Sequence, residues 1–259
     1  MKLLVPGLRF AFGTLSVLRV RVDRWDREAG GAAMVVAPAV GVVLGALAAG
    51  AGALPAWRGG PLLGAVGAVA VLAALTRGLH LDGLADVADG LGSGKPAEDA
   101  LRIMKQSDIG PFGVLTLLLV LLAQVAALAG EFAGSLREGA LAVLTAAVTA
   151  RCALAWGCLR SVPAARPGGL GAMVASTVRP AAALGISALS AAALGAAAWA
   201  SSADGWAALR YPAAVAVGLG TAWLLLRRCV RRLDGITGDV LGAMAETAAT
   251  GVLVALAVS

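Results

Sequence analysis

Three aspartates share one face of a predicted helix in the stretch HLDGLADVADG, residues 80–90. Asp82, Asp86 and Asp89 are separated by four and then three positions, so a helix aligns their carboxylates over about two turns. A solvated helix end is the alternative, but like charges at this spacing repel one another. Carboxylate ligands suit Mg²⁺, which binds through one or two carboxylates together with substrate phosphates. We therefore predict that these aspartates hold Mg²⁺, as one ion or as a pair about 4 Å apart.

The same stretch contains the only histidine of the chain and two glycines. We expect His80 at the same height as the carboxylates, where a structural role and a substrate- or proton-handling role are both open. Gly83 and Gly90 allow a backbone or a ligand to approach closely. The following GLGSGKP, residues 90–96, fails the pattern of a phosphate-binding P-loop, because Pro96 stands where a serine or threonine would reach magnesium.

Three further polar segments carry candidate substrate-binding residues. Each segment has an ordinary explanation as a basic loop, a turn or a helix cap, but the charge pattern below places all of them on one side of a membrane. Asp239 and Asp89 are the two candidates for a general base that accepts a hydroxyl proton. The candidates for substrate binding in these segments are Arg102, Lys105, Ser107, Asp108, Arg166 and Thr237.

The elements that position these residues are predicted to be membrane-spanning helices. Of the 259 residues 59% are hydrophobic and only 14% are charged, whereas about 25% of the residues of a soluble domain are charged. Apolar runs long enough to cross a hydrocarbon core of about 30 Å recur along the chain. We expect one all-α, polytopic membrane domain over residues 1–259 with about seven spans. The expected spans are 32–54, 61–79, 112–130, 139–158, 181–200, 211–226 and 240–258.

The basic residues indicate how this domain is oriented. Of the 21 lysines and arginines, 17 fall in one alternating set of segments that begins with the N-terminus. Only Arg58, Arg137 and Arg210 fall in the other set, and Arg151 lies inside a span. Because cytoplasmic loops carry the excess of Lys and Arg, we expect a cytoplasmic N-terminus. The net charge of +6 is then a topology signal, and nucleic-acid binding is not required to explain it.

Two long segments are expected on the cytoplasmic side. Residues 1–31 are predicted to form a segment at the membrane surface, because proline and repeated arginines interrupt any cleavable signal. Residues 80–111 form the main active-site loop, with the three aspartates at the cytoplasmic end of the second span. We expect the protein in the cell (inner) membrane with its active site facing the cytoplasm. The sequence leaves a homo-oligomer open.

Two kinds of residue are expected inside the apolar layer. The three cysteines have no C-x-x-C spacing, and we expect them to be small buried hydrophobic residues. Arg151 and Glu246 lie at similar depth in their spans, which predicts an intramembrane ion pair.

Four motifs, in their order along the chain, resemble those of the cobalamin synthase family, whose members are also called adenosylcobinamide-GDP ribazoletransferases. They are HLDGLADVADGL, MKQSDIGPFG, ARPGGLGA and TGDVLGA, and the resemblance covers about residues 79–245. It implies an integral membrane, magnesium-dependent transferase that joins adenosylcobinamide-GDP to α-ribazole or its 5'-phosphate and releases GMP. One departure is Asp234, where the family pattern leads us to expect glycine.

Two other classes compete with this interpretation. A CDP-alcohol phosphotransferase also uses an aspartate cluster at a membrane surface, and DGLAD matches the start of its motif, but Asp86 stands where arginine is expected. A transporter would place its carboxylates near the bilayer midplane. Here the carboxylates gather toward one face, which favours chemistry over transport.

Overall fold

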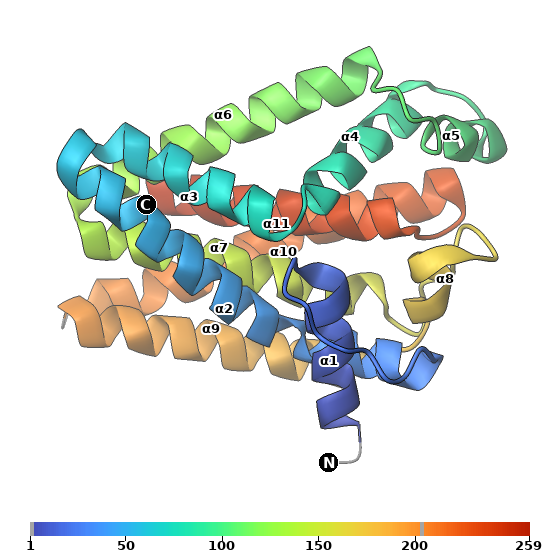
Figure 1. Ribbon diagram of the computed structural model, residues 1–259, viewed down its shortest axis with the longest axis horizontal. Coiled ribbons are helices and arrows are strands. Elements are labelled where there is room, and N and C mark those ends of the chain that lie inside the picture. The colour runs from blue at the N-terminus through green and yellow to red at the C-terminus, as the bar shows by residue number, and fades with distance from the viewer. Residues whose placement is uncertain (1–2, 203–204) are drawn as a thin grey trace.

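The computed structural model describes residues 3–202 and 205–259, and within these ranges every regular element is a helix (Figure 1). The helices are α1 (Leu4–Leu15), α2 (Arg27–Gly59), α3 (Pro61–Leu75), α4 (Leu79–Gly92), α5 (Ala97–Ile103), α6 (Pro111–Gly134), α7 (Leu136–Gly157), α8 (Gly169–Val174), α9 (Pro180–Ser202), α10 (Gly205–Leu233) and α11 (Gly238–Ala257). The predicted all-α fold is therefore confirmed.

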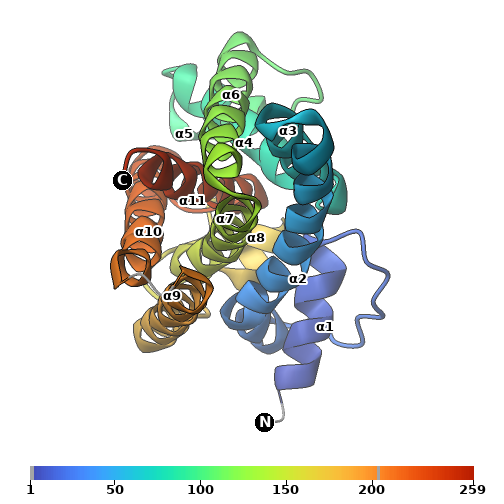
Figure 2. The ribbon, with the colours of Figure 1, turned by 90° about the vertical axis from the view of Figure 1, so that its left-hand side faces the viewer.

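Six of these helices are long and apolar enough to cross a membrane: α2, α6, α7, α9, α10 and α11. Each contains one of the predicted spans, give or take a residue or two at an end. The bundle is built around α7, which packs against α2, α6, α9, α10 and α11 (Figure 2). The outward side of α6 shows Leu115, Leu118, Leu119 and Leu122 at 56–65% exposure, which is the surface expected of a helix that contacts lipid.

The prediction for the second span, residues 61–79, is only partly correct. α3 ends at Leu75 after 15 residues, a length of about 22 Å at 1.5 Å per residue. The chain then bends by 88° and continues as α4. Left-handed backbone at Arg77 (φ 57°) and Gly78 (φ 67°) breaks the helix at this point. The aspartates consequently belong to a separate helix.

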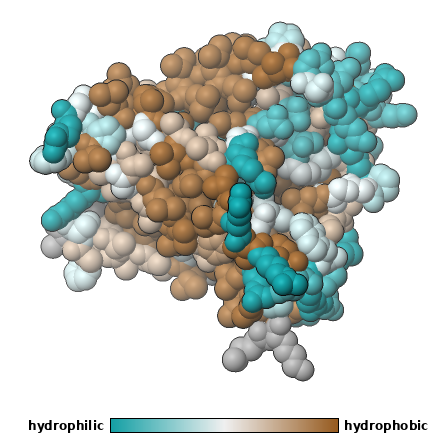
Figure 3. All heavy atoms as spheres, viewed as in Figure 1, coloured by the Kyte–Doolittle hydropathy of each residue, from teal (hydrophilic) through white to brown (hydrophobic). Residues whose placement is uncertain are grey.

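Polar side chains gather at one end of the bundle, and apolar side chains cover its middle (Figure 3). The connections from α4 through α5 to α6, from α7 through α8 to α9, and from α10 to α11 all lie at this end (Figure 1). The four polar segments singled out in the sequence therefore lie at the same end of the molecule. Residues 80–111 contain the two helices α4 and α5 rather than an extended loop.

The N-terminal segment 1–31 contains α1, which packs against α2. Phe10 of α1 is fully buried, and its ring contacts the ring of Trp25. Asp26 then caps α2 by accepting a hydrogen bond from the N–H of Ala29 at 2.9 Å.

A very close crossing of α4 and α11 fixes the position of the aspartate helix. A β-carbon added at Gly83 would lie 2.7 Å from the carbonyl oxygen of Asp239 and 2.9 Å from its Cα. One turn further along α11, a β-carbon at Gly242 would lie 3.1 Å from the Cα of His80. Glycine at both positions lets the two backbones touch, as in other membrane helix pairs with small residues at the contact.

We predict that Gly83→Ala lowers the stability of the protein by about 1–3 kcal/mol, because the added methyl group overlaps backbone that cannot move aside. Thermal unfolding in detergent measures the effect. Gly185→Ala is the matched control, since an added β-carbon in α9 meets no atom within 4 Å. Equal melting temperatures for the two variants would show that the crossing is not tightly packed.

Candidate active site

Four carboxylates gather where α4 crosses the beginning of α11. Asp82, Asp86 and Asp89 come from α4, and Asp239 lies in the first turn of α11 beside Gly83. Asp82 is exposed, Asp86 and Asp239 are half-buried, and Asp89 is buried. The helix thus brings together the three predicted carboxylates, and the crossing adds the fourth.

The charges of this cluster act on Asp86, which lies beyond the six spans at the polar end of the molecule. Burial and the neighbouring carboxylates of Asp239, Asp82 and Asp89 raise the pKa of Asp86 to about 7, against a smaller lowering by Arg166. The cluster therefore carries more negative charge than the nearby cation balances.

Asp89 has a structural role that its spacing did not reveal. Its Oδ2 accepts a hydrogen bond from the N–H of Gly110 at 2.8 Å, and its Oδ1 accepts one from the N–H of Gly113 at 2.9 Å. Gly110 is the N-cap of α6, so the carboxylate caps the N-terminus of that helix and opposes its positive dipole. A β-carbon at either glycine would lie 2.5 Å from an Asp89 oxygen, which explains the glycines of the IGPFG motif.

Two loops that are distant in the sequence hold Arg166 beside Asp239. The N–H of Ile236 donates to the carbonyl oxygen of Pro163, and the N–H of Ala165 donates to that of Ile236, both at 2.9 Å. This short parallel bridge carries Arg166 to the α10–α11 turn, where its Nη1 lies 3.9 Å from Oδ2 of Asp239. The bridge therefore places these two segments side by side.

Thr237 starts α11 and orients Asp239. Its Oγ1 accepts a hydrogen bond from the N–H of Val240 at 3.2 Å and lies 3.1 Å from Oδ2 of Asp239, to which it donates. Gly171 of α8 packs on the backbone of Thr237, where a β-carbon would lie 2.7 Å from the Thr237 Cα. The side chain predicted to bind substrate is thus also a helix cap.

A cationic cleft opens between α5 and the loop before α8. It has a volume of about 770 Å³ and is lined by Arg102, Lys105 and Arg166, by the backbone of Gly168 and Gly169, and by other residues of these segments. Arg102 also pairs with Asp99 on its own helix. Three of the predicted substrate-binding cations therefore face one space.

A second cleft, of about 310 Å³, lies along the carboxylate side of α4. Asp86, Asp89 and Asp108 line it together with Lys95 and Gln106. Sequence reasoning missed the last two residues, because exposed polar side chains in a loop carry no spacing signal. Ser107 is exposed and lies outside the clefts described here. Gly90 packs against Met104 of the α5 region, where an added β-carbon would lie 2.6 Å from the Met104 Cγ, so the absence of a side chain allows close packing there.

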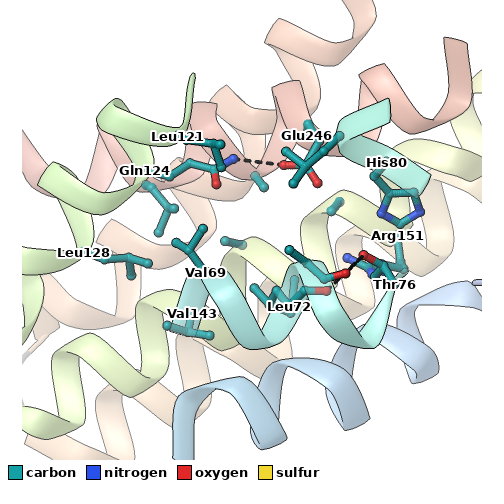
Figure 4. A pocket seen from close by; sticks show the side chains of 17 residues that line it. Val69, Leu72, Thr76, His80, Leu121, Gln124, Leu128, Val143, Arg151 and Glu246 are labelled. Carbon is teal, nitrogen blue, oxygen red and sulfur yellow. Dashed lines mark hydrogen bonds between the residues drawn. The ribbon is translucent and has the colours of Figure 1, made fainter. Parts of the chain in front are cut away.

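His80 lines one cavity together with Asp82 and Asp239, but it also faces a second space. On a helix, positions 80 and 82 point about 200° apart, and His80 faces a separate cavity inside the bundle (Figure 4). This cavity of about 40 Å³, room for one or two water molecules, is also lined by Gln124, Arg151 and Glu246. Gln124 is a polar residue that the sequence analysis overlooked.

The predicted direct ion pair between Arg151 and Glu246 is wrong. Glu246 accepts a hydrogen bond from Nε2 of Gln124 at 3.0 Å. Within the described part of the chain, Nε and Nη2 of Arg151 are buried without a hydrogen-bond partner. The two charges face the same cavity and act on each other across it (Figure 4). The three cysteines are buried and free, as expected.

The residues at the site fit a magnesium ion by their chemistry. In residues 3–202 and 205–259, no three acidic, histidine or cysteine side chains converge tightly enough to enclose an ion by themselves. Mg²⁺ does not require such an enclosure, because it keeps several waters and binds through one or two carboxylates plus phosphates. Asp82 and Asp86 would supply those carboxylates, whereas both oxygens of Asp89 accept hydrogen bonds from the start of α6.

Comparison with known proteins agrees with these features. The family model described as cobalamin-5-phosphate synthase matches residues 7–257. The chain belongs to the cobalamin-5-phosphate synthase family. A relative from Frankia casuarinae, named adenosylcobinamide-GDP ribazoletransferase, is 45% identical over 97% of this chain and 94% of its own length. A relative of the same name from a Nocardioides species is 41% identical over 96% of this chain and 97% of its own length. No solved structure matches the chain.

Because the chain belongs to this family, the two alternative classes, the CDP-alcohol phosphotransferases and the transporters, no longer apply. Asp234, where glycine was expected, lies in the turn before α11. This residue adopts a left-handed conformation with φ 60°, and Gly235 follows with φ 156°. Aspartate is among the few side chains that tolerate the left-handed region, so this family member keeps the turn before α11 without a glycine at position 234.

We predict that Asp89→Ala destabilises the protein by about 3 kcal/mol, because two amide groups at the start of α6 lose a charged acceptor. Asp89→Asn should cost less, since its carbonyl oxygen still accepts one of the two hydrogen bonds. Thermal unfolding in detergent ranks the stabilities of the wild type and the two variants. Asp108→Ala, at an exposed carboxylate of the same cleft, is the control and should change stability by less than about 0.5 kcal/mol. An alanine variant of Asp89 as stable as this control would contradict the capping role.

We predict that Glu246→Gln lowers the melting temperature and that adding Arg151→Met restores it, because the single change leaves an unbalanced buried cation. Thermal unfolding of the wild type, both single variants and the double variant forms a double-mutant cycle. Additive effects would show that the two charges are independent despite the shared cavity.

Proposed function

We propose that the protein is a magnesium-dependent transferase that joins adenosylcobinamide-GDP to α-ribazole, or to its 5'-phosphate, and releases GMP. The names of the relatives support this choice of substrates. The observation that carries it is the carboxylate cluster of Asp82, Asp86 and Asp239 next to a cleft lined by Arg102, Lys105 and Arg166. A site that combines oxygen ligands with cations is what a diphosphate requires.

The proposed reaction is a phosphoryl transfer. A ribose hydroxyl of α-ribazole forms a bond to the phosphorus attached to cobinamide, the anhydride bond to GMP breaks, and the hydroxyl proton passes to a carboxylate. Such reactions depend mainly on positioning and on stabilisation of charge. When bound, Mg²⁺ would neutralise charge on the diphosphate oxygens.

The residues of this chain have distinct roles in this proposal. Asp82 and Asp86 are the proposed magnesium ligands, and Asp239, which accepts a hydrogen bond from Thr237, is our choice for the general base. Asp89 acts through the start of α6 and is a positioning residue, although each of its oxygens keeps a second lone pair for an ion. Arg166, Lys105 and Arg102 would hold phosphate oxygens in the cationic cleft.

We further propose that the polar end of the bundle faces the cytoplasm in the cell (inner) membrane. The support is the distribution of basic residues, with 17 of the 21 lysines and arginines in one alternating set of segments. Adenosylcobinamide-GDP and ribazole would then reach the site from the aqueous side.

We predict that Asp82→Asn and Asp86→Asn abolish GMP release by protein reconstituted in vesicles, because each removes a charge that the ion and the diphosphate need. Asp86→Asn should also leave the melting temperature unchanged or raise it, since it relieves repulsion among the carboxylates. GMP release is followed by chromatography with adenosylcobinamide-GDP, with and without α-ribazole.

Two observations would count against this assignment. Wild-type turnover in either variant, or in excess EDTA, would exclude the metal role. GMP release that does not depend on α-ribazole would exclude the transfer reaction. Glu28→Gln, which changes an exposed carboxylate in the first turn of α2 outside the clefts, controls for a general loss of negative charge and should remain active.

A further inference from the structure

Besides the two clefts and the cavity at Gln124, a further cavity extends from the carboxylates into the apolar part of the bundle. Its volume is about 160 Å³, and α1, α2, α4, α7, α8 and α11 contribute to its lining. Leu15, Met34, Leu154 and Leu241 form much of the wall, and each is at most 7% exposed. Asp82 is exposed and Asp239 is half-buried, and together with Leu79, which is 47% exposed, they lie at the mouth.

We propose that this space, the base cavity, binds the aromatic base of the acceptor nucleoside, so that the attached ribose lies beside Asp82 and Asp239. The inference rests on the proposed function, which identifies the acceptor as α-ribazole. Its base is a benzimidazole with two methyl groups, a flat, neutral and largely apolar ring system.

Size and polarity both favour this occupant. An apolar cavity of about 150 Å³ stays dry and accepts a benzene molecule, so the six-membered ring of the base fits the deep part of the cavity. Both ring nitrogens belong to the five-membered ring and stay at the mouth, where water reaches them. Thr14 and His80 are the polar lining residues besides the two aspartates, so a guanine base would bury more hydrogen-bonding groups than these two could satisfy, which is costly. A diphosphate would find no lysine or arginine in the lining of this cavity.

The placement also fits the proposed chemistry. The ribose follows the base at the mouth, next to the carboxylate of Asp239 that is proposed to take the hydroxyl proton. The Asp239 carboxylate lies 3.9 Å from Arg166, which lines the cationic cleft. Acceptor and diphosphate would therefore approach the same carboxylate from two separate spaces.

Gly238 offers a direct way to test the base cavity. It lines the cavity, and an added β-carbon there meets no atom within 4 Å. Gly238→Val should therefore fill part of the space without a clash in the unliganded protein. We expect the KM for α-ribazole to rise about tenfold or more, as for a lost methylene-sized space in an apolar pocket. The KM for adenosylcobinamide-GDP should stay within about twofold.

A second acceptor substrate with a smaller base tests whether the change in kinetics depends on the base. Wild-type protein in vesicles is compared with Gly238→Val using α-ribazole and the riboside of unmethylated benzimidazole. The variant should shift the ratio of kcat/KM toward the smaller base. Gly220→Val is the matched control, because a β-carbon at this position of α10 also meets no atom within 4 Å, and it should retain wild-type kinetics. Should Gly238→Val fail to fold, the smaller Gly238→Ala gives the same shift in weaker form.

The outcomes separate this inference from the proposed function. A rise in the KM for α-ribazole together with a shifted base preference supports the base cavity. Unchanged KM values, equal increases for both substrates, or an unchanged base preference overturn it while the transferase function stands. Absence of GMP release by the wild-type protein with either acceptor overturns the proposed function, and the base cavity with it.

Discussion

The backbone contact between α4 and α11 at Gly83 is the constraint on which the site depends. A side chain at this position would separate the helices, because the Asp239 backbone lies within 3 Å of where a β-carbon would stand. The contact brings the carboxylates of α4 to the first turn of α11, where Asp239 begins the next apolar helix. An arrangement of four like charges is thus imposed by packing rather than by attraction among the charged groups.

The surrounding structure makes this concentration of charge tolerable. The backbone amides of α6 hold Asp89, the hydroxyl of Thr237 and the guanidinium of Arg166 face Asp239, and Asp82 is exposed. Asp86 has no comparable compensation, and its raised pKa of about 7 records the imbalance. Binding a cation there would relieve a repulsion that folding has already imposed.

The sequence predicted those features that depend on local periodicity. The shared face of Asp82, Asp86 and Asp89 follows from 3.6 residues per turn, and the six long spans follow from apolar length. The same helical periodicity separates the directions of positions 80 and 82, so His80 lines the cavity of Gln124, Arg151 and Glu246 as well as the one that contains Asp82 and Asp239. The similar depth predicted for Arg151 and Glu246 agrees with their place at one cavity, but it does not imply that the two side chains touch.

Other features depend on long-range packing and left no local signal. The hydrogen bonds from Gly110 and Gly113 to Asp89 join positions more than 20 residues apart, between the α6 N-terminus and α4. The 88° bend after α3 requires left-handed backbone at Arg77, a non-glycine residue for which the sequence gives little warning. The bridge that positions Arg166 beside Asp239 likewise joins two loops that are distant in the sequence, so no local pattern predicts it.

The position of the site between polar and apolar surroundings gives the proposed reaction a physical rationale. The cationic cleft opens outward beside Arg102 and Lys105, whereas the base cavity leads inward among Leu154 and Leu241. A charged donor and an apolar base require opposite environments, and the base requires an apolar interior. In this bundle the spanning helices already supply that interior, and Asp239 marks its boundary with the polar end. Placing the transfer at this boundary allows each substrate to keep the environment that stabilises it until the reacting groups meet.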